Sequence, residues 1–184
     1  MTELSLNILD VANNSIRANA SKIVIKITIN VPSDSMCIII DDNGSGMTKE
    51  QLSAVEDPFF TTRTTRKVGL GIPFFRSAAL LTGGTFQMQS EVNQGTTVTA
   101  TFQLSHIDRM PLGDITSTIH TLVTLNPQIR FIYTYKYNNK DFTLDTDEFR
   151  EILGDISFQT KEVSTYIKQY LEENKKEVDD GIYL

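Results

Sequence analysis

The stretch SMCIIIDDNGSGM, residues 35–47, joins an apolar run to two carboxylates and two closely spaced glycines. Its continuous apolar run predicts a strand over residues 35–42 that is buried on both faces. A carboxylate that ends such a strand can accept a hydrogen bond from an amino group deep in a pocket. Gly44 and Gly46 allow a tight turn and let a flat ligand approach the backbone closely. Asp-Asn-Gly is also ordinary turn chemistry, so the stretch alone leaves both interpretations open.

The residues before this stretch predict an amphipathic helix and a strand. At about 100° per residue, the apolar side of residues 4–18 is separated from a polar stripe that we expect to face solvent. The apolar side comprises Leu4, Ile8, Val11, Ala12 and Ile16, and the polar stripe Asn7, Asp10, Asn14 and Arg17. Residues 22–31 alternate with period two, which predicts a strand with one solvated face.

The residues after it predict two helices and a hairpin. Thr48 and Gln51 have the spacing of a capping box at the start of a short helix. Residues 56–69 show no apolar period and indicate a loop. Residues 70–82 predict a helix that ends at Gly83 and Gly84, and the strands 85–92 and 96–104 would be joined through a turn at 93–95.

The order of these elements favours an α+β fold. Helix, strand, strand, loop, helix, strand and strand over residues 1–104 would form a two-layer α/β sandwich, a mixed sheet with helices on one face. Residues 105–184 would form a smaller extension. Its expected elements are a helix at 111–124, strands at 130–137 and 141–146, and helices at 147–153 and 160–177. We therefore expect one domain over 1–104 and an extension over 105–184, which could pack on the same sheet.

Composition narrows the class of protein. The chain has 184 residues, of which 40% are hydrophobic and 22% charged, and its single cysteine is Cys37. These features predict a cytoplasmic globular protein without a disulfide or a membrane span. Residues 1–103 carry a net charge of -1 and residues 104–184 a net charge of -5. An acidic second half argues against nucleic acid as a partner, because that binding needs a positive surface.

Three further segments carry chemistry. KVGLGI, residues 67–72, follows a basic loop and places Gly69 and Gly71 at the start of a helix, where free amides and the helix dipole favour an anion. GTTV, residues 95–98, offers two hydroxyls near the start of a strand. Asp10 and Asn14 lie one helical turn apart. Each has a plain alternative: close helix packing, a hairpin turn and a solvated helix face, respectively.

Taken in order, these segments resemble a known family. Asn14, DDNGSGM (41–47), PFFTTR (58–63) with GLGI (69–72), and GTT (95–97) have the order and approximate spacing of the GHKL ATPases. These are the gyrase, heat-shock-chaperone, histidine-kinase and MutL nucleotide-binding domains, which share the Bergerat fold. The resemblance covers roughly residues 4–103. The PFFTTR and GLGI segments look most like histidine kinases, whereas residues 13–25 look more like the start of MutL.

The resemblance implies that the chain binds ATP and Mg²⁺. Asn14 would hold Mg²⁺ through its amide oxygen, and Asp42 would bind the adenine amino group with Thr97 beside it. Residues 56–69 would form a lid over the nucleotide. The other implied nucleotide contacts are Gly44, Gly46 and Met47 around adenine, and Arg63, Arg66, Lys67, Gly69, Leu70 and Gly71 at the phosphates.

Two departures from the family pattern matter. Lys67 stands where kinase relatives have the first glycine of Gly-x-Gly-Leu-Gly, so a cation could serve the phosphates directly while the lid loses flexibility. The first helix also starts almost at Met1, where the family usually has a preceding strand. We expect the hairpin at 130–146 to cover the sheet edge that this strand would occupy.

The residues leave three kinds of activity open. In hydrolytic relatives a carboxylate four residues before the magnesium asparagine orients the attacking water, and Asp10 stands at that position, which makes it the candidate general base. Slow hydrolysis or an ATP-gated switch acting on a protein partner is therefore the first expectation, with ATP-dependent homodimerisation as in gyrase and MutL. A protein kinase component that phosphorylates an acceptor in trans and a non-hydrolysing nucleotide sensor are the alternatives.

The kinase alternative directs attention to the two histidines. SHIDRMPL, residues 105–112, resembles the acceptor segment SHELRTPL of histidine kinases, but Ile107 stands where an acidic residue should follow His106. A linker turn before a helix accounts for the same residues. His120 lies in an apolar helical context and is expected to be a core or boundary residue.

Overall fold

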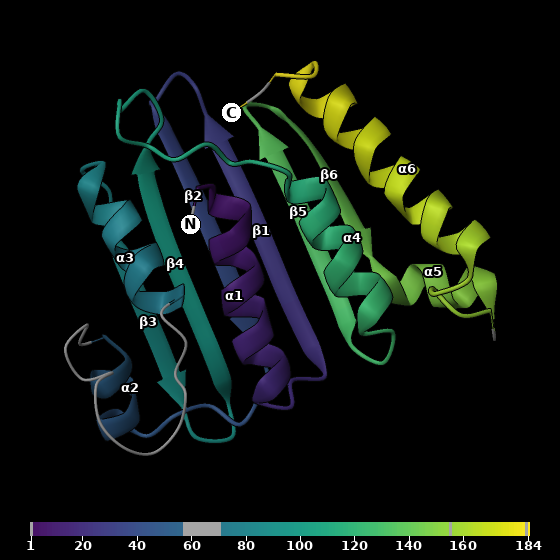
Figure 1. The fold of residues 1–184 in the computed structure, drawn as a ribbon, viewed down its shortest axis with the longest axis horizontal. Helices are drawn as coiled ribbons and strands as arrows, with labels where there is room; N and C mark the ends of the chain where they lie inside the picture. The colour runs from purple at the N-terminus through teal and green to yellow at the C-terminus, as the bar shows by residue number, and fades with distance from the viewer. Residues whose placement is uncertain (1, 57–70, 155, 183) are drawn as a thin grey trace.

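The computed structural model describes residues 2–56, 71–154, 156–182 and 184, which form one six-stranded sheet covered by helices on one face (Figure 1). The strands are β1 (Lys22–Asn30), β2 (Ser35–Asp42), β3 (Phe86–Glu91), β4 (Gly95–Gln103), β5 (Arg130–Tyr137) and β6 (Lys140–Asp145). The helices are α1 (Leu4–Arg17), α2 (Lys49–Glu56), α3 (Gly71–Leu81), α4 (Ile115–Leu125), α5 (Thr146–Leu153) and α6 (Lys161–Asp179). This architecture confirms the expected α+β sandwich.

The sheet is mixed, with the order β3-β4-β2-β1-β5-β6. Strand β1 pairs with β2 in antiparallel and with β5 in parallel orientation, and the other pairs are antiparallel. The hairpin of β5 and β6 thus extends the sheet beyond β1, as expected for a segment that covers an otherwise open edge. Residues 1–104 and residues 105–184 contribute to the same sheet and to one hydrophobic core. The division into a domain and an extension at residue 104 therefore stays a prediction.

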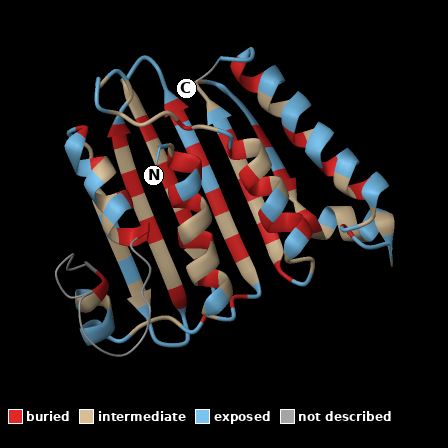
Figure 2. Ribbon diagram, viewed as in Figure 1, coloured by how far each residue is buried: buried red, intermediate tan, exposed pale blue. Residues whose placement is uncertain are grey.

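One face of the sheet is buried and the other is open, and Figure 2 shows the buried residues alternating along the strands. On β1, Ile23, Ile25, Ile27 and Ile29 point into the core. Strand β2 alternates in the same way, with Met36, Ile38 and Ile40 buried and the residues between them half-buried. The prediction that residues 35–42 are buried on both faces is therefore wrong, because the helices cover only one side of the sheet.

Helix α1 lies in the middle of the helical layer and packs against α3 and α4 (Figure 1). Of its predicted apolar side, Leu4, Ile8, Val11 and Ala12 are buried and Ile16 is partly buried against the core. Asn7, however, was expected to be solvated and is fully buried, with its Oδ1 atom lacking a hydrogen-bond partner among the described residues. The neighbouring helices flank α1 on both sides, so its solvated stripe is narrower than an isolated helix would show.

The start of α4 differs from the expectation for a physical reason. A helix was predicted from residue 111, but α4 begins at Ile115 after Asp114, whose carboxylate accepts a hydrogen bond from the backbone N–H of Ser117. The preceding carbonyls of Pro111 and Leu112 accept instead from the free N–H groups of Leu4 and Ser5 at 2.9 Å. The first four N–H groups of an α-helix have no partner within the helix. This linker therefore caps the N-terminus of α1 by accepting from two of them.

The remaining local predictions hold where the structure describes them. Thr48 Oγ1 and Gln51 Oε1 each accept from the other residue's backbone N–H, so the capping box at α2 is confirmed. The predicted loop at 56–69 falls almost wholly outside the described residues. Within the described ranges, no helix is both long enough and apolar enough to cross a membrane.

Helix α6 is fastened to the sheet through a buried carboxylate. Asp179 is fully buried and accepts hydrogen bonds from the Tyr135 hydroxyl at 2.9 Å and the Lys175 ammonium at 2.6 Å. Lys175 also lies 5.3 Å from the centroid of the Tyr135 ring. Burial, reinforced by Asp179, raises the pKa of Tyr135 well above its usual range, so the phenol stays protonated and donates to the carboxylate.

We expect Tyr135→Phe to destabilise the protein, because it removes one donor from a buried charge. The free energy of unfolding should fall by about 1–3 kcal/mol, measured by urea denaturation. Tyr137→Phe on the same strand is the control, since the structure shows no hydrogen bond from its hydroxyl among the described residues. Equal stability of the two variants would contradict an anchoring role for the buried pair.

Candidate functional site

Several of the predicted site residues that the structure describes lie at one end of the sheet, beneath the C-terminal half of α1. Strand β2 ends there with Asp42, and β4 begins there with Gly95. The first residue of α3, Gly71, lies against α1 at the same end. Segments that are far apart in the sequence are thus brought together around α1.

Asp42 is held from two sides. Its carboxylate is 7% exposed and accepts a hydrogen bond from the Ser15 hydroxyl of α1 at 2.5 Å through Oδ2. Its Oδ1 atom accepts from the backbone N–H of Gly44 at 2.8 Å. Both donors leave the carboxylate with free lone pairs, so the group remains an acceptor with a fixed orientation.

Close backbone packing explains the glycines around Asp42. A Cβ on Gly44 would lie 2.9 Å from the Cβ of Ala18 at the end of α1. Gly46 has φ +61, and a Cβ there would lie 1.9 Å from the carbonyl oxygen of Glu91. Gly95 has φ +109, and a Cβ there would lie 1.8 Å from the carbonyl oxygen of Asp42 itself. These glycines let β2, β4 and α1 meet closely enough to fix the carboxylate. Met47 follows them, half-buried against the core.

Asp10 lies beside the N-terminus of α3. A Cβ placed on Gly71 would be 2.9 Å from Asp10 Oδ2 and 2.7 Å from Asp10 Cβ, so Gly71 leaves room for this carboxylate. The N-terminus of a helix carries unpaired N–H groups and a partial positive charge, which favour an anion such as a phosphate. The candidate base therefore lies next to a helix N-terminus, which is a kind of place that can accommodate an anion.

Asn14 follows Asp10 by one turn of α1 and is half-exposed. Its Oδ1 accepts a long hydrogen bond of 3.4 Å from Arg17, which leaves the amide oxygen accessible. The described residues contain no group of three or more His, Cys, Asp or Glu side chains that could hold a metal ion. Mg²⁺ usually keeps several waters and binds through one or two protein oxygens plus substrate phosphates, so a single amide oxygen at this place fits it.

The structure does not bring Thr97 to Asp42. Thr97 pairs with Asp41, and its hydroxyl donates to that carboxylate at 2.5 Å. Thr96 is the residue that pairs with Asp42. Residues paired across two strands share a face of the sheet, and neighbours along a strand alternate, so Thr97 lies on the open face and Thr96 on the helical face with Asp42.

Several predicted contacts lie outside the described residues. They are Arg63, Arg66, Lys67, Gly69 and Leu70, together with the segment predicted to be the lid. The structure thus places Gly71 against Asp10 and Gly44 against Asp42, with Asn14 one turn after Asp10 on α1 and with Gly46 and Met47 following Asp42 along the chain. Thr97 pairs with Asp41 on the other face of the sheet.

Ser15 contacts the candidate site through Asp42, and the sequence patterns missed it. Its partner Asp42 is 27 positions away, and Ser15 directly follows Asn14 in a helix where a small residue on the buried side is unremarkable. The hydrogen bond depends on how α1 lies across β2, which periodicity alone does not determine. The prediction named Thr97 instead of its neighbour Thr96, which pairs with Asp42. A difference of one position along a strand moves a side chain to the other face of the sheet.

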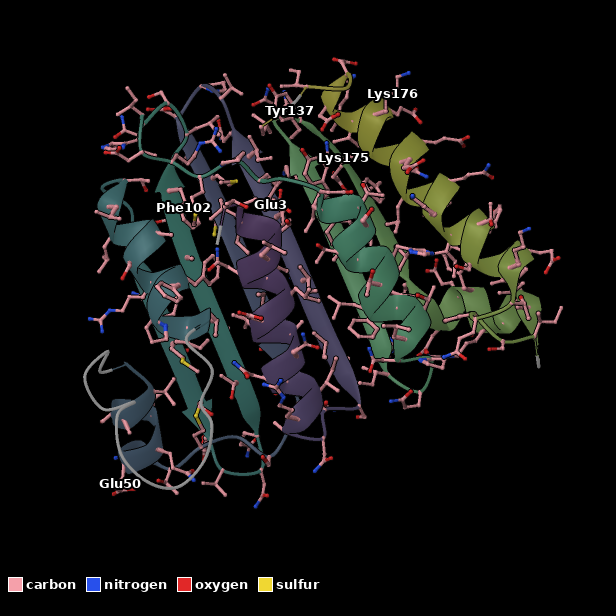
Figure 3. The ribbon with its side chains drawn as sticks, in the orientation of Figure 1. Glu3, Glu50, Phe102, Tyr137, Lys175 and Lys176 are labelled. Carbon is pink, nitrogen blue, oxygen red and sulfur yellow. The ribbon has the colours of Figure 1, made fainter. Side chains whose placement is uncertain are left out.

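The two histidines lie away from this site. His106 follows β4 in a turn, where its Nδ1 accepts from the backbone N–H of Asp108 at 3.2 Å. Nine residues of β4 separate that turn from the Asp42 end, a span of roughly 27 Å at the usual strand rise. In Figure 3, Phe102 near the end of β4 lies in the upper part of the view and Glu50 of α2 at the bottom. His120 bonds Ser164 on α6 and is a boundary residue, as expected.

Comparison with known proteins gives a family match over the first part of the chain. Residues 2–106 match the model of the histidine kinase-, DNA gyrase B-, and HSP90-like ATPases. Sporulation kinase D of Bacillus subtilis is 32% identical over 98 residues, which are 53% of this chain and 19% of that protein. Sensor histidine kinase ZraS of Escherichia coli is 30% identical over 100 residues, which are 54% of this chain and 21% of that protein. The chain spans about a fifth of the length of these relatives.

Solved structures share the fold over more of the chain. The MutL ATPase domain of Aquifex aeolicus, solved with ADP, has a TM-score of 0.54 and 14% identity, covering 83% of this chain and 69% of that one. The N-terminal domain of a DNA repair protein also has a TM-score of 0.54, with 16% identity, covering 79% of this chain and 52% of that one. At these identities the likeness shows the fold alone.

Proposed function

The chain belongs to the histidine kinase-, DNA gyrase B- and HSP90-like ATPase family, and from this premise we propose that it binds ATP with Mg²⁺ and hydrolyses it slowly. The observation that carries the proposal is the arrangement of α1. This one helix places Ser15 on the Asp42 carboxylate and places Asp10 beside the N-terminus of α3. One helix thus contacts both the carboxylate proposed to accept the nucleobase amino group and the helix start proposed to bind the phosphates.

The residues around α1 would have different roles in binding and hydrolysis. Asp42 would accept a hydrogen bond from the adenine amino group, with Thr96 on the same face of the sheet. The free N–H groups at the start of α3 would bind phosphate oxygens. Asp10 would accept a proton from a water molecule and orient it toward the terminal phosphorus, which a carboxylate at hydrogen-bond distance can do.

Magnesium fits the oxygen donors at this place. Asn14 would hold the ion through its amide oxygen, and the bound ion would neutralise charge on the phosphate oxygens. We therefore expect ATP affinity to depend on Mg²⁺. Omission of the metal should weaken binding of ATP, and the effect should be smaller in Asn14→Ala, as isothermal titration calorimetry would show.

The adenine site is tested by two neighbouring carboxylates on opposite faces of the sheet. Asp42→Asn should weaken ATP binding by about 5- to 150-fold, because a buried acceptor for the amino group is lost. Asp41→Asn is the control: Asp41 binds Thr97 on the open face and should leave ATP affinity within about twofold, the range of an ordinary surface change. Equal affinities of wild-type protein and Asp42→Asn in calorimetry would remove Asp42 from the nucleotide site.

A second candidate function is protein phosphorylation in trans, which the two kinase relatives favour. Transfer to His106 within the same molecule is disfavoured, because β4 separates it from the Asp42 end. Incubation with γ-labelled ATP distinguishes the activities: free phosphate indicates hydrolysis, and label on a protein indicates transfer. Tight binding without either product indicates the third alternative, a nucleotide sensor.

Protein partners and a homodimer belong to the same proposal. The extension carries most of the net negative charge and exposes Ile152, Ile156 and Tyr166, which suits contact with another protein. Size-exclusion chromatography with light scattering, with and without a non-hydrolysable ATP analogue, tests dimerisation. A mass that doubles only with the analogue supports an ATP-dependent dimer, and an unchanged mass contradicts it. Cytoplasmic location and the absence of a nucleic-acid partner remain predictions from composition.

A further inference from the structure

We propose that Ser15 is a positioning residue that fixes Asp42 for recognition of a 6-aminopurine. The inference rests on the proposed function, because it takes Asp42 as the acceptor for the nucleobase amino group. It goes further by assigning base selectivity to a hydroxyl that lies on a different element from the carboxylate.

The hydrogen bond between these residues is buried and directional. Ser15 is 3% exposed, and its hydroxyl has Asp42 Oδ2 at 2.5 Å and the Val11 carbonyl oxygen at 3.4 Å. A serine has one hydroxyl proton, so the shorter contact to the carboxylate is the hydrogen bond. Donors bound to a charged acceptor form shorter and stronger hydrogen bonds than neutral pairs do.

Two anchors on the two oxygens define the plane of the carboxylate. Gly44 N–H holds Oδ1 through the loop that follows β2, and Ser15 holds Oδ2 from α1. With both in place, the side chain has little freedom to rotate, and each oxygen has one remaining lone pair to offer. Without Ser15, rotation of the carboxyl group would be restrained by the Gly44 contact alone.

The same contact selects the chemistry of the base. Because Ser15 and Gly44 both donate to it, the Asp42 carboxylate presents acceptor oxygens toward the base, which pair with an amino group and repel a keto oxygen in its place. Ser15 also directly follows Asn14, so the residue that orients the base acceptor and the residue proposed to hold magnesium are fixed to the same turn of α1.

Comparison of two nucleotides isolates this role. ATP and purine riboside triphosphate differ only in the 6-amino group, so a residue that acts through Asp42 affects ATP alone. Ser15→Ala should weaken ATP binding by about threefold to tenfold while purine riboside triphosphate changes by less than about twofold. Calorimetry with Mg²⁺ on the full chain measures both affinities.

A matched control uses the other buried serine of the same helix. Ser5 is also fully buried, and its hydroxyl binds Glu3 at 2.7 Å, at the opposite end of α1 from the site. Ser5→Ala makes the same chemical change and should alter neither affinity. Ser15→Thr keeps a hydroxyl and should retain the preference for ATP. If Ser15→Ala fails to fold, Ser15→Cys gives the same comparison with a weaker donor of similar shape.

The outcomes separate this inference from the proposed function. Equal losses for both nucleotides in Ser15→Ala would show a structural role only and overturn the inference, as would an unchanged ATP affinity. In the Asp42→Asn background, Ser15→Ala should cause no further loss of discrimination, because the two residues act as a unit. Wild-type protein that binds ATP without preferring it to the purine nucleotide would refute the assigned role of Asp42, whereas wild-type protein that binds neither would refute the proposed function itself.

Discussion

Asp10→Asn is expected to reduce release of phosphate from ATP by about 10²- to 10⁴-fold, the contribution that a positioned general base usually makes. The amide cannot accept the proton of the attacking water, but it has nearly the same size and can still fit beside Gly71. ATP affinity should therefore change by less than about threefold, since the base acts on the water rather than on nucleotide binding. Single-turnover measurements with labelled ATP, together with calorimetry, separate the two effects.

Asp10→Glu serves as the control for this prediction. It keeps the carboxylate and lengthens the side chain by one methylene. Some phosphate release should persist in this variant. Phosphate release from Asp10→Asn that stayed within twofold of wild type would contradict the assignment and leave water attack to another group.

Gly95→Ala should destabilise the protein by about 3–5 kcal/mol, near the upper end for a single substitution. Two costs combine at this position. The backbone has φ +109, which side chains with a Cβ rarely adopt, and the Cβ would overlap the carbonyl oxygen of Asp42 at 1.8 Å. Relief of that overlap requires β2 and β4 to separate at the end where Asp42 lies, so ATP binding should be lost along with stability.

Gly83→Ala separates the two costs. Gly83 also has a positive φ, +72, but its Cβ would meet only Gln103 Oε1 at 4.0 Å. The free energy of unfolding of Gly83→Ala should fall by about 1 kcal/mol because of the backbone conformation alone. Urea denaturation of both variants measures the difference, and a Gly95→Ala variant as stable as Gly83→Ala would refute the proposed backbone overlap.

Local patterns predicted most of the fold because they follow the covalent chain. Period-two alternation predicted β1, the turn at 93–95 indicated the hairpin of β3 and β4, and the capping box at Thr48 and Gln51 marked α2. Asp42 could be recognised because it ends an apolar strand and precedes two glycines. Asp10 and Asn14 could be paired because one helical turn separates them.

What the sequence could not provide depends on contacts between distant segments. Ser15 meets Asp42 only because α1 crosses β2 at one particular angle, and Asn7 is buried because other helices flank it. Thr97 lies on the opposite face of the sheet from Asp42 because of strand parity, which the length of the turn at 93–95 determines. Helix α4 starts later than predicted because the carbonyls of Pro111 and Leu112 cap α1 instead of continuing α4. No local sequence pattern shows such a contact.

The parallel pairing of β1 with β5 has a consequence for how the molecule reaches its native state. Lys22 pairs with Arg130, so closing this ladder brings together segments separated by more than half the chain. Such contacts form late, because the entropy of closing a long loop is lost before the pairing compensates for it. During synthesis, β1 would emerge from the ribosome early and wait with one edge unpaired until β5 follows, which makes this edge the place where chaperone binding or aggregation would begin.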